Sequence, residues 1–266
     1  MTTAARTVPL RVAVLGFGEA GSEFARDLVA AGADVRGFDP IVTAPHGVQQ
    51  RDGDADAVRD AELVFSLTTA TEAERALRVS LPALSPGTLW AEANTAAPTL
   101  KVRLAELVKD AGADLVDVAI MAPVPGRGLR TPMFVSGSAA SQFVELLAEF
   151  GVAVDQVPGP VGAASSRKLL RSVVYKGLAA AVVEALAGAA AAGCADWLHE
   201  HLIQEFQNFD AQTVQRLITG TFEHAVRRTE EMEAAAGQLA DLGVTPRIAA
   251  ATRDALRVIA ESGEPR

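Results

Sequence analysis

The sequence has few of the residues that mark secreted scaffolds, nucleic-acid binders or membrane proteins. It contains one cysteine, Cys194, which excludes an internal disulfide and favours a reducing compartment. Acidic residues outnumber basic ones, and the formal net charge of -9 argues against general affinity for nucleic acid or anionic membranes. The best membrane-span candidate, 178–192, falls short of the roughly 20 apolar residues that a bilayer requires and is interrupted by Glu184. We therefore interpret it as a buried helix and expect a cytoplasmic protein without nucleic-acid or membrane partners.

The most informative segment is an apolar run that ends in a glycine-rich turn. Residues 12–15 lead into Gly-x-Gly-x-x-Gly, which is followed at once by a helical pattern. In a dinucleotide site the first glycine permits a tight turn, the second lets the backbone approach the pyrophosphate, and the third lets helix and strand pack closely. The first helix amides then face the phosphates. The predicted cofactor-binding turn comprises Gly16, Phe17, Gly18, Glu19, Ala20 and Gly21.

An acidic residue follows where such sites bind the adenosine ribose. Asp39 ends the second apolar run, about twenty residues beyond the glycines. Its carboxylate would repel a 2′-phosphate, so NAD is favoured as cofactor, with NADP not excluded. Arg36 favours NADP instead, but strand alternation places it on the opposite face from Asp39. The alternative interpretation of Asp39 is a turn residue before Pro40.

Strand and helix patterns alternate through the first part of the chain. Strands are predicted at 12–15, 35–38, 63–67, 88–92, 115–119 and 133–136, and helices at 22–31, 72–79, 98–111 and 141–150. This alternation predicts an α/β fold with a Rossmann-type, doubly wound, mostly parallel sheet. From residue 163 onward only helical patterns remain, beginning with a long helix over 164–192. We predict a nucleotide-binding domain over 1–160 and an all-α substrate and dimerisation domain over 161–266.

The beginning of the long helix concentrates charged and polar residues. Lys168, Ser172 and Lys176 are spaced by four and share one helix face, with Arg171 and Tyr175 beside them. A cationic stripe in an acidic protein favours a small anionic metabolite as substrate. The alternative is a solvated helix face. We also expect a homodimer through the helical domain, because a long alanine-rich helix that leaves a compact unit usually packs against a partner. The alternative is that its own chain covers it.

In order and spacing, the chain resembles the β-hydroxyacid dehydrogenases, which include 3-hydroxyisobutyrate and 6-phosphogluconate dehydrogenases. The resemblance rests on segments 16–21, 117–137 and 162–168 and covers nearly the whole chain. It implies a Rossmann domain joined to an all-α domain through a long helix. It also implies an NAD(P)-dependent oxidoreductase that transfers a hydride between nicotinamide and a small β-hydroxy acid, or performs the reverse carbonyl reduction.

The same resemblance implies roles for individual residues. Lys168 matches the family's catalytic lysine, a general acid/base that takes the hydroxyl proton. Asn94 and Thr95 match the turn that contacts the nicotinamide ribose and the substrate, and Thr68 and Thr69 match the loop over the cofactor's ribose. Each of the turn and loop residues has an alternative interpretation as a turn residue that satisfies its own backbone.

Two departures from the family pattern put the substrate in doubt. Where the family usually has Asp-Ala-Pro-Val-Ser-Gly-Gly, this chain has Asp-Val-Ala-Ile-Met-Ala-Pro, starting at Asp117. Met121 thus replaces a serine that would hold a substrate carboxylate, and Pro123 offers no amide. Ser172 replaces the asparagine that usually follows the lysine four residues later. The segment from Lys168 to Ser172, with Lys176 and Gly177, resembles a divergent, 6-phosphogluconate dehydrogenase-like bacterial branch.

These departures leave more than one function open. Without the usual anchor, the substrate anion is expected to be held by Arg171 or Lys176, beside a more apolar pocket near Met121. An imine reductase and a cofactor-binding regulatory module without turnover are the alternatives. No metal site is expected, because the four histidines form no ligand constellation. The predicted substrate-binding residues are Asn94, Met121, Arg171, Ser172 and Lys176.

Overall fold

The structure, a computed structural model, describes residues 8–262 and divides the chain into two compact units, Met1–Arg171 and Ser172–Arg266. The division falls inside one continuous helix, α6 (Ala163–Ala191). The domain boundary that we place between residues 160 and 161 stays a prediction.

A single mixed sheet organises the first unit. Within the described residues its strands are β1 (Arg11–Leu15), β2 (Asp34–Phe38), β3 (Gln49–Gln50), β4 (Leu63–Ser66), β5 (Leu89–Glu92), β6 (Asp114–Ile120), β7 (Met133–Ser136) and β8 (Asp155–Gln156). Their order in the sheet is β3-β2-β1-β4-β5-β6-β7-β8. Every neighbouring pair is parallel except β6 and β7. The strand order reverses beside β1, and ligands bind at the carboxyl ends of strands at such a switch point.

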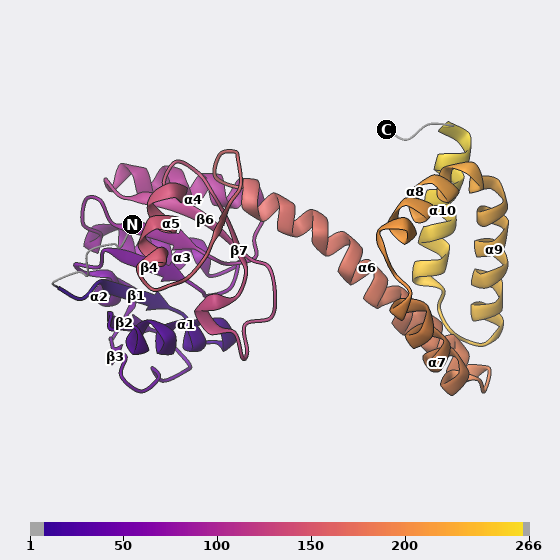
Figure 1. Cartoon of the computed structure of the whole chain (residues 1–266), viewed down its shortest axis with the longest axis horizontal. Coiled ribbons are helices and arrows are strands. Elements are labelled where there is room, and N and C mark those ends of the chain that lie inside the picture. Colours follow the sequence, from indigo (N-terminus) through magenta and orange to yellow (C-terminus); the bar gives the residue numbers. More distant parts are fainter. Residues whose placement is uncertain (1–7, 263–266) are drawn as a thin grey trace. The chain divides into compact units, whose positions relative to one another are not determined.

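Helices cover both faces of this sheet (Figure 1). They are α1 (Glu19–Ala30), α2 (Asp54–Val58), α3 (Ala73–Ser80), α4 (Pro98–Asp110) and α5 (Ala140–Ala148), with 3-10 turns at Leu81–Ala83 and Gly128–Arg130. On one face Phe65 contacts Phe24 and Phe143 edge-on, with ring centroids 5.6 and 5.8 Å apart. On the other face Trp90 packs in a second core with Leu104. Burial of both faces is typical of a parallel sheet.

The second unit is all-helical over its described residues. Beyond the remainder of α6 it contains α7 (Ala195–Gln207), α8 (Ala211–Glu223), α9 (Ala225–Asp241) and α10 (Arg247–Ser262). Helices α9 and α10 lie side by side (Figure 1). The carboxylate of Glu184 on α6 accepts hydrogen bonds from the amides of Ile248 and Ala249, both at 2.8 Å. It therefore satisfies amides in the first turn of α10 that have no partner within the helix.

The predicted α/β class, with a Rossmann-type sheet followed by helices, is confirmed. The short elements β3, β8 and α2 were not predicted, because two to five residues are too few to show a periodicity. Helix α1 begins at Glu19, earlier than the predicted Ser22, because Gly18 is the extended residue that caps it. The helix therefore starts inside the glycine turn, where its first amides lie next to Gly18.

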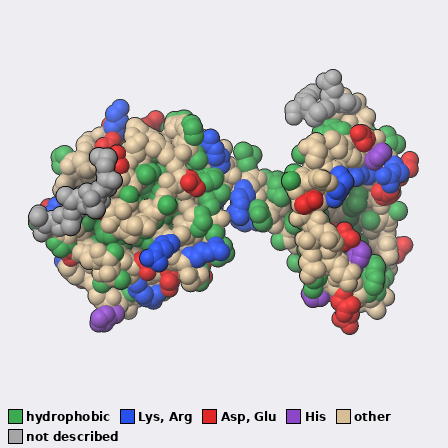
Figure 2. All heavy atoms as spheres, in the orientation of Figure 1, with side chains coloured by type: hydrophobic (Ala, Val, Ile, Leu, Met, Phe, Trp, Pro, Cys, Tyr) green, Lys and Arg blue, Asp and Glu red, His purple; other side chains and the backbone are tan. Residues whose placement is uncertain are grey.

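The interpretation of 178–192 as a buried helix is wrong for this chain. Leu178 and Val183 are 43% and 68% exposed, and Figure 2 shows hydrophobic side chains at the surface of α6. Many of the apolar residues in this segment are alanines, which raise its hydropathy without requiring a neighbour to cover them. Among the described residues, α6 is the one helix whose length and composition would allow it to cross a membrane.

Candidate functional site

A cavity of about 400 Å³ lies at the carboxyl ends of β1, β2 and β4, inside the first unit. Its lining brings together residues from three separate turns of the chain. They include Gly16 and Gly18 after β1, Asp39 after β2, and Thr68 and Thr69 after β4. The cavity is therefore at the switch point of the sheet, and it gathers five of the predicted cofactor-binding residues.

The three glycines of the turn differ in what a side chain at each position would meet. Gly16 has a φ of +93°, and a Cβ there would stand 2.4 Å from the carbonyl oxygen of Leu67. A Cβ on Gly21 would stand 1.9 Å from the carbonyl oxygen of Gly16, so strand and helix can approach only without it. A Cβ on Gly18 would meet no atom within 4 Å. The bare backbone at Gly18 thus borders open space at the start of α1, which fits a pyrophosphate that the helix amides would bind.

Asp39 is held as a carboxylate by the backbone around it. Its Oδ2 accepts a hydrogen bond from the Phe17 amide at 2.7 Å, and its Oδ1 accepts from the amides of Ile41 and Val42 at 2.8 Å. Burial works against ionisation, but these amides outweigh it and lower the pKa of Asp39 below its ordinary value. Asp39 is thus a turn residue and also a charged group in the cavity lining. Arg36 instead donates to the carbonyl of Arg59.

Three charged residues in the cavity lining were not predicted. Asp54 on α2 is 4% exposed and lies 3.1 Å from the guanidinium of Arg75 on α3. Arg75 also pairs with Glu72 at 2.6 Å, and that hydrogen bond is the main reason why its pKa is raised. Burial raises the pKa of Asp54, although Arg75 opposes the shift. No sequence signal connects Asp54 and Arg75, because they lie 21 residues apart on two short helices.

The turn after β5 is joined to the turn after β4 by Asn94. Its side chain is almost fully buried, and its Nδ2 lies 2.7 Å from Glu92 Oε1, 3.1 Å from Ser66 Oγ and 3.3 Å from Thr68 Oγ1. The next residue, Thr95, is exposed. The structure therefore brings the predicted residues Asn94 and Thr68 into contact.

Lys168 lies on the second turn of α6 and is half-buried. Residues three and four apart share a helix face, so Lys168 lies on the same face as the buried Ala164 and Ser165. Neither Lys168 nor Asn94 lines the cavity described above.

The predicted substrate residues lie on two elements. Met121 follows β6, is half-buried, and donates its amide to the carbonyl of Pro132 at 2.8 Å. Arg171 is exposed on α6 at the end of the first unit. Ser172, half-buried, and Lys176, exposed, continue along α6 in the second unit. The substrate roles of these residues stay predictions.

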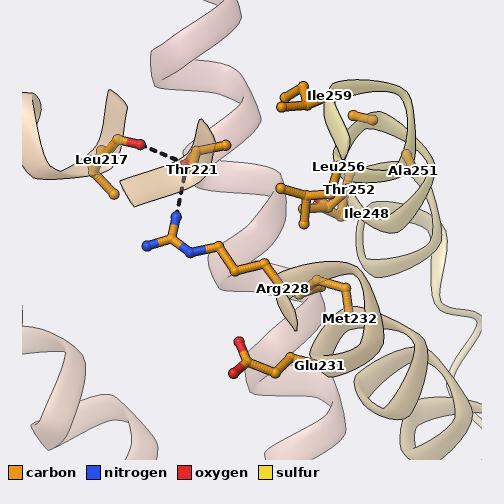
Figure 3. A pocket seen from close by; sticks show the side chains of 11 residues that line it. Leu217, Thr221, Arg228, Glu231, Met232, Ile248, Ala251, Thr252, Leu256 and Ile259 are labelled. Carbon is orange, nitrogen blue, oxygen red and sulfur yellow. Dashed lines mark hydrogen bonds between the residues drawn. The ribbon is translucent and has the colours of Figure 1, made fainter. Parts of the chain in front are cut away.

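A second cavity, of about 800 Å³, lies among α8, α9 and α10 in the second unit (Figure 3). Its walls are mostly apolar, and Met232, Ile248 and Leu256 are among the lining residues. Arg228 reaches across to donate to Thr221 Oγ1 at 2.7 Å, and Thr221 in turn donates to the carbonyl of Leu217. The lining of this second cavity contains none of the predicted site residues.

The glycine turn, the carboxylate after β2 and the position of the cavity at the sheet's switch point define a Rossmann-type dinucleotide-binding protein. Residues 11–151, more than half of the chain, match the sequence family described as the NAD binding domain of 6-phosphogluconate dehydrogenase. Residues 189–259 match a domain of unknown function (DUF1932). The chain belongs to the β-hydroxyacid dehydrogenase-like family, and its cofactor is NAD or NADP.

Several known proteins are similar to this chain. A probable 3-hydroxyisobutyrate dehydrogenase of Mycobacterium tuberculosis (strain H37Rv) is 32% identical over 136 residues, which cover 49% of this chain and 46% of that protein. A conserved hypothetical protein of Sinorhizobium meliloti 1021 has a similar structure, with 26% identity, a TM-score of 0.61, and coverage of 95% of this chain and 89% of that one. An imine reductase from Myxococcus stipitatus, solved in complex with NADP+, shares the fold at 19% identity and a TM-score of 0.78, covering 95% of both chains.

Replacing Gly18 with alanine should weaken cofactor binding without disturbing the fold. The added methyl group meets only open space in the protein, so Gly18→Ala should stay within about 0.5 kcal/mol of the natural unfolding free energy. It should raise the Kd for NADH about tenfold or more, equivalent to about 1.4 kcal/mol. Chemical denaturation and NADH fluorescence titration measure the two quantities.

Gly21→Ala is the matched variant for this comparison. Its methyl group would collide with the carbonyl of Gly16, so it should destabilise the fold by about 1–3 kcal/mol even without cofactor. Equal NADH affinity in Gly18→Ala and the natural protein would show that the pyrophosphate does not approach this turn.

Proposed function

We propose that this protein is an NAD-dependent dehydrogenase that oxidises a small β-hydroxy acid, or catalyses the reverse carbonyl reduction, in the cytoplasm. The observation that carries the proposal is the cavity that gathers Gly16, Gly18 and Asp39 at the carboxyl edge of the sheet. The family supports an oxidoreductase that uses a nicotinamide nucleotide. The single cysteine of the sequence supports a reducing compartment.

Different residues of the cavity would bind different parts of the cofactor. The backbone at Gly18 and the first amides of α1 would bind the pyrophosphate, since they border open space. The ionised carboxylate of Asp39 would accept hydrogen bonds from the ribose hydroxyls and repel a 2′-phosphate. Thr68 and Thr69 line the same cavity, and their hydroxyl groups would bind the second ribose.

Chemistry on the substrate would rest on residues beyond that cavity. The amine of Lys168 would accept the proton of the substrate hydroxyl during oxidation and return it during reduction. A nicotinamide bound in the cavity would supply the hydride acceptor for the same carbon atom. Asn94 would orient the substrate and the neighbouring ribose, because its side chain is fixed against Glu92 and Thr68. Arg171 and Lys176 would hold the anionic end of the substrate, with Ser172 between them on α6.

Imine reduction is the second candidate. The observation that favours it is the half-buried Met121 at the end of β6, an apolar side chain where the family usually places a polar anchor. The cationic residues Lys168 and Lys176 disfavour a cationic substrate, so a hydroxy acid remains the preferred candidate substrate. A screen of β-hydroxy acids and cyclic imines against both nicotinamides, followed by reduced-cofactor absorbance, separates these candidates. Cofactor binding with no turnover of either class would favour the regulatory module.

The carboxylate of Asp39 should determine which nicotinamide the protein prefers. Asp39→Asn removes the charge at constant size, so the ratio of kcat/KM with NAD to that with NADP should fall about tenfold or more. Steady-state kinetics with both cofactors measure the ratio. The control is Asp52→Asn, at an exposed position outside the cavity lining, which should leave the ratio as it is. An unchanged ratio in Asp39→Asn would remove Asp39 from cofactor selection.

Lys168→Met should abolish proton transfer and leave cofactor binding intact. We expect kcat to fall by at least about 10²-fold, with the Kd for NADH close to that of the natural protein. Arg167→Met is a matched control, because it removes a neighbouring positive charge from an exposed position on the same helix. Activity retained in Lys168→Met would refute its role as the acid/base.

We further propose that two copies of the chain associate through the helical part. Exposed large apolar side chains are concentrated there: Val173 and Val174 on α6 are 71% and 66% exposed, and Trp197 on α7 is 62% exposed. The same unit carries the apolar cavity among α8, α9 and α10. In a two-fold symmetric dimer the same patch of both copies meets, so one interface can cover the exposed apolar residues of each copy.

Light scattering on a sizing column should give twice the chain mass of 27.7 kDa. Val173→Asp should dissociate the dimer, whereas Val79→Asp, on the exposed face of α3, should not. A monomer at micromolar concentration, or sedimentation with phosphatidylglycerol vesicles, would contradict the proposal.

A further inference from the structure

A lysine lies at a core position of α4. Lys101 is fully buried and shares a helix face with the buried Leu104 and Val108. Its Nζ donates to the carbonyl oxygen of Glu92 at 2.6 Å and lies 3.3 Å from Asp117 Oδ1 and 3.9 Å from Glu92 Oε1. Both carboxyl groups are also fully buried. Burial of an ammonium group is unfavourable unless it is paired, and replacing such groups with apolar residues is often neutral for stability.

On one side the lysine is connected to the turn that carries Asn94. Glu92 is the last residue of β5. Its side chain accepts hydrogen bonds from the backbone amide and the Nδ2 of Asn94 at 3.2 and 2.7 Å. Glu92 also accepts from Trp90 Nε1 at 3.2 Å, so every oxygen of its side chain has a donor. Lys101 therefore fixes the end of β5 from which the Asn94 turn departs.

On the other side the lysine is connected to the first turn of α6. Asp117 accepts hydrogen bonds from the amides of Gly162 and Ser165, both at 3.0 Å, and from Ser165 Oγ at 2.5 Å. Ser136 extends the same contact, because its Oγ donates to Asp117 and accepts from the amide of Ala164. Lys168 follows Ser165 by one turn of the helix. The ammonium of Lys101 thus stands between the turn that carries Asn94 and the helix that carries Lys168.

We propose that Lys101 is a positioning residue for the oxidoreductase site. By pairing with Glu92 and Asp117 at once, it fixes the first turn of α6 relative to the Asn94 turn, and so fixes Lys168 relative to the groups that orient the substrate. The proposal rests on the function proposed above for Lys168. It predicts that loss of the ammonium group loosens these two segments specifically and lowers kcat more than it changes cofactor affinity.

Lys101→Met keeps the length of the side chain and removes the charge. In the free protein, hydrogen exchange should increase at residues 93–95 and 162–168, while the strands β1 and β4 keep their protection. The Kd for NADH should change less than about twofold, and kcat should fall by about 10²-fold, the size expected when a reacting group is misplaced by about an ångström. Lys109→Met is the matched control, because it removes an exposed lysine from the same helix.

A second variant covers the case in which Lys101→Met does not fold. Lys101→Met combined with Glu92→Gln keeps the formal charge of the buried group unchanged and should show the same local rise in exchange at 162–168. Natural exchange and natural kcat in either folded variant would overturn the proposal. A rise in exchange spread evenly over the first unit would also overturn it, since that is the result expected of a purely structural lysine.

The two proposals can fail separately. If the natural protein turns over no hydroxy acid or imine, the proposed function fails, and the exchange data still decide whether Lys101 holds the start of α6.

Discussion

The buried carboxylate of Asp117 determines where the long helix leaves the sheet. It lies in β6, is fully buried, and accepts the amides of Gly162 and Ser165 together with the hydroxyl of Ser165. Amides at the start of a helix have no partner within it, and the positive end of the helix dipole favours an anion there. One side chain of the sheet therefore satisfies the first turn of α6 and complements its dipole. Lys168, which follows on the second turn of the same helix, takes its place from this contact.

A buried carboxylate requires a compensating charge, and the sequence supplies it from α4 through Lys101. That solution brings in a second carboxylate, Glu92, and through it the Asn94 turn. An apolar core of the same volume would be about as stable, because desolvation offsets much of the attraction between buried charges. Stability alone thus gives little reason for three buried charged groups. A geometric requirement on the two segments that carry the proposed site residues Asn94 and Lys168 gives a stronger one.

The sequence was sufficient for features that depend on neighbouring residues. The strand and helix periodicities, the glycine turn and the position of Asp39 all follow from local patterns, and the structure gathers Gly16, Gly18 and Asp39 around one cavity. Contacts between distant segments were not predictable in this way. The pairing of Asp54 with Arg75 joins residues on two short helices, and the exposure of α6 depends on what surrounds it. Lys101 did leave a signal, since it interrupts the apolar stripe that continues at Leu104 and Val108.

The departures from the family pattern can be understood from the same arrangement. In the proposed mechanism the anchor for the substrate anion moves from the segment after β6, where Met121 and Pro123 provide little, to Arg171 and Lys176 on α6. The proposed general acid/base and the anchor then belong to one continuous helix, whose first turn is bound by Asp117. Residues three apart share a helix face, so a substrate anion held by Arg171 would lie beside Lys168. Selection of the substrate and proton transfer would thus both depend on how firmly the first turn of α6 is tied to the sheet.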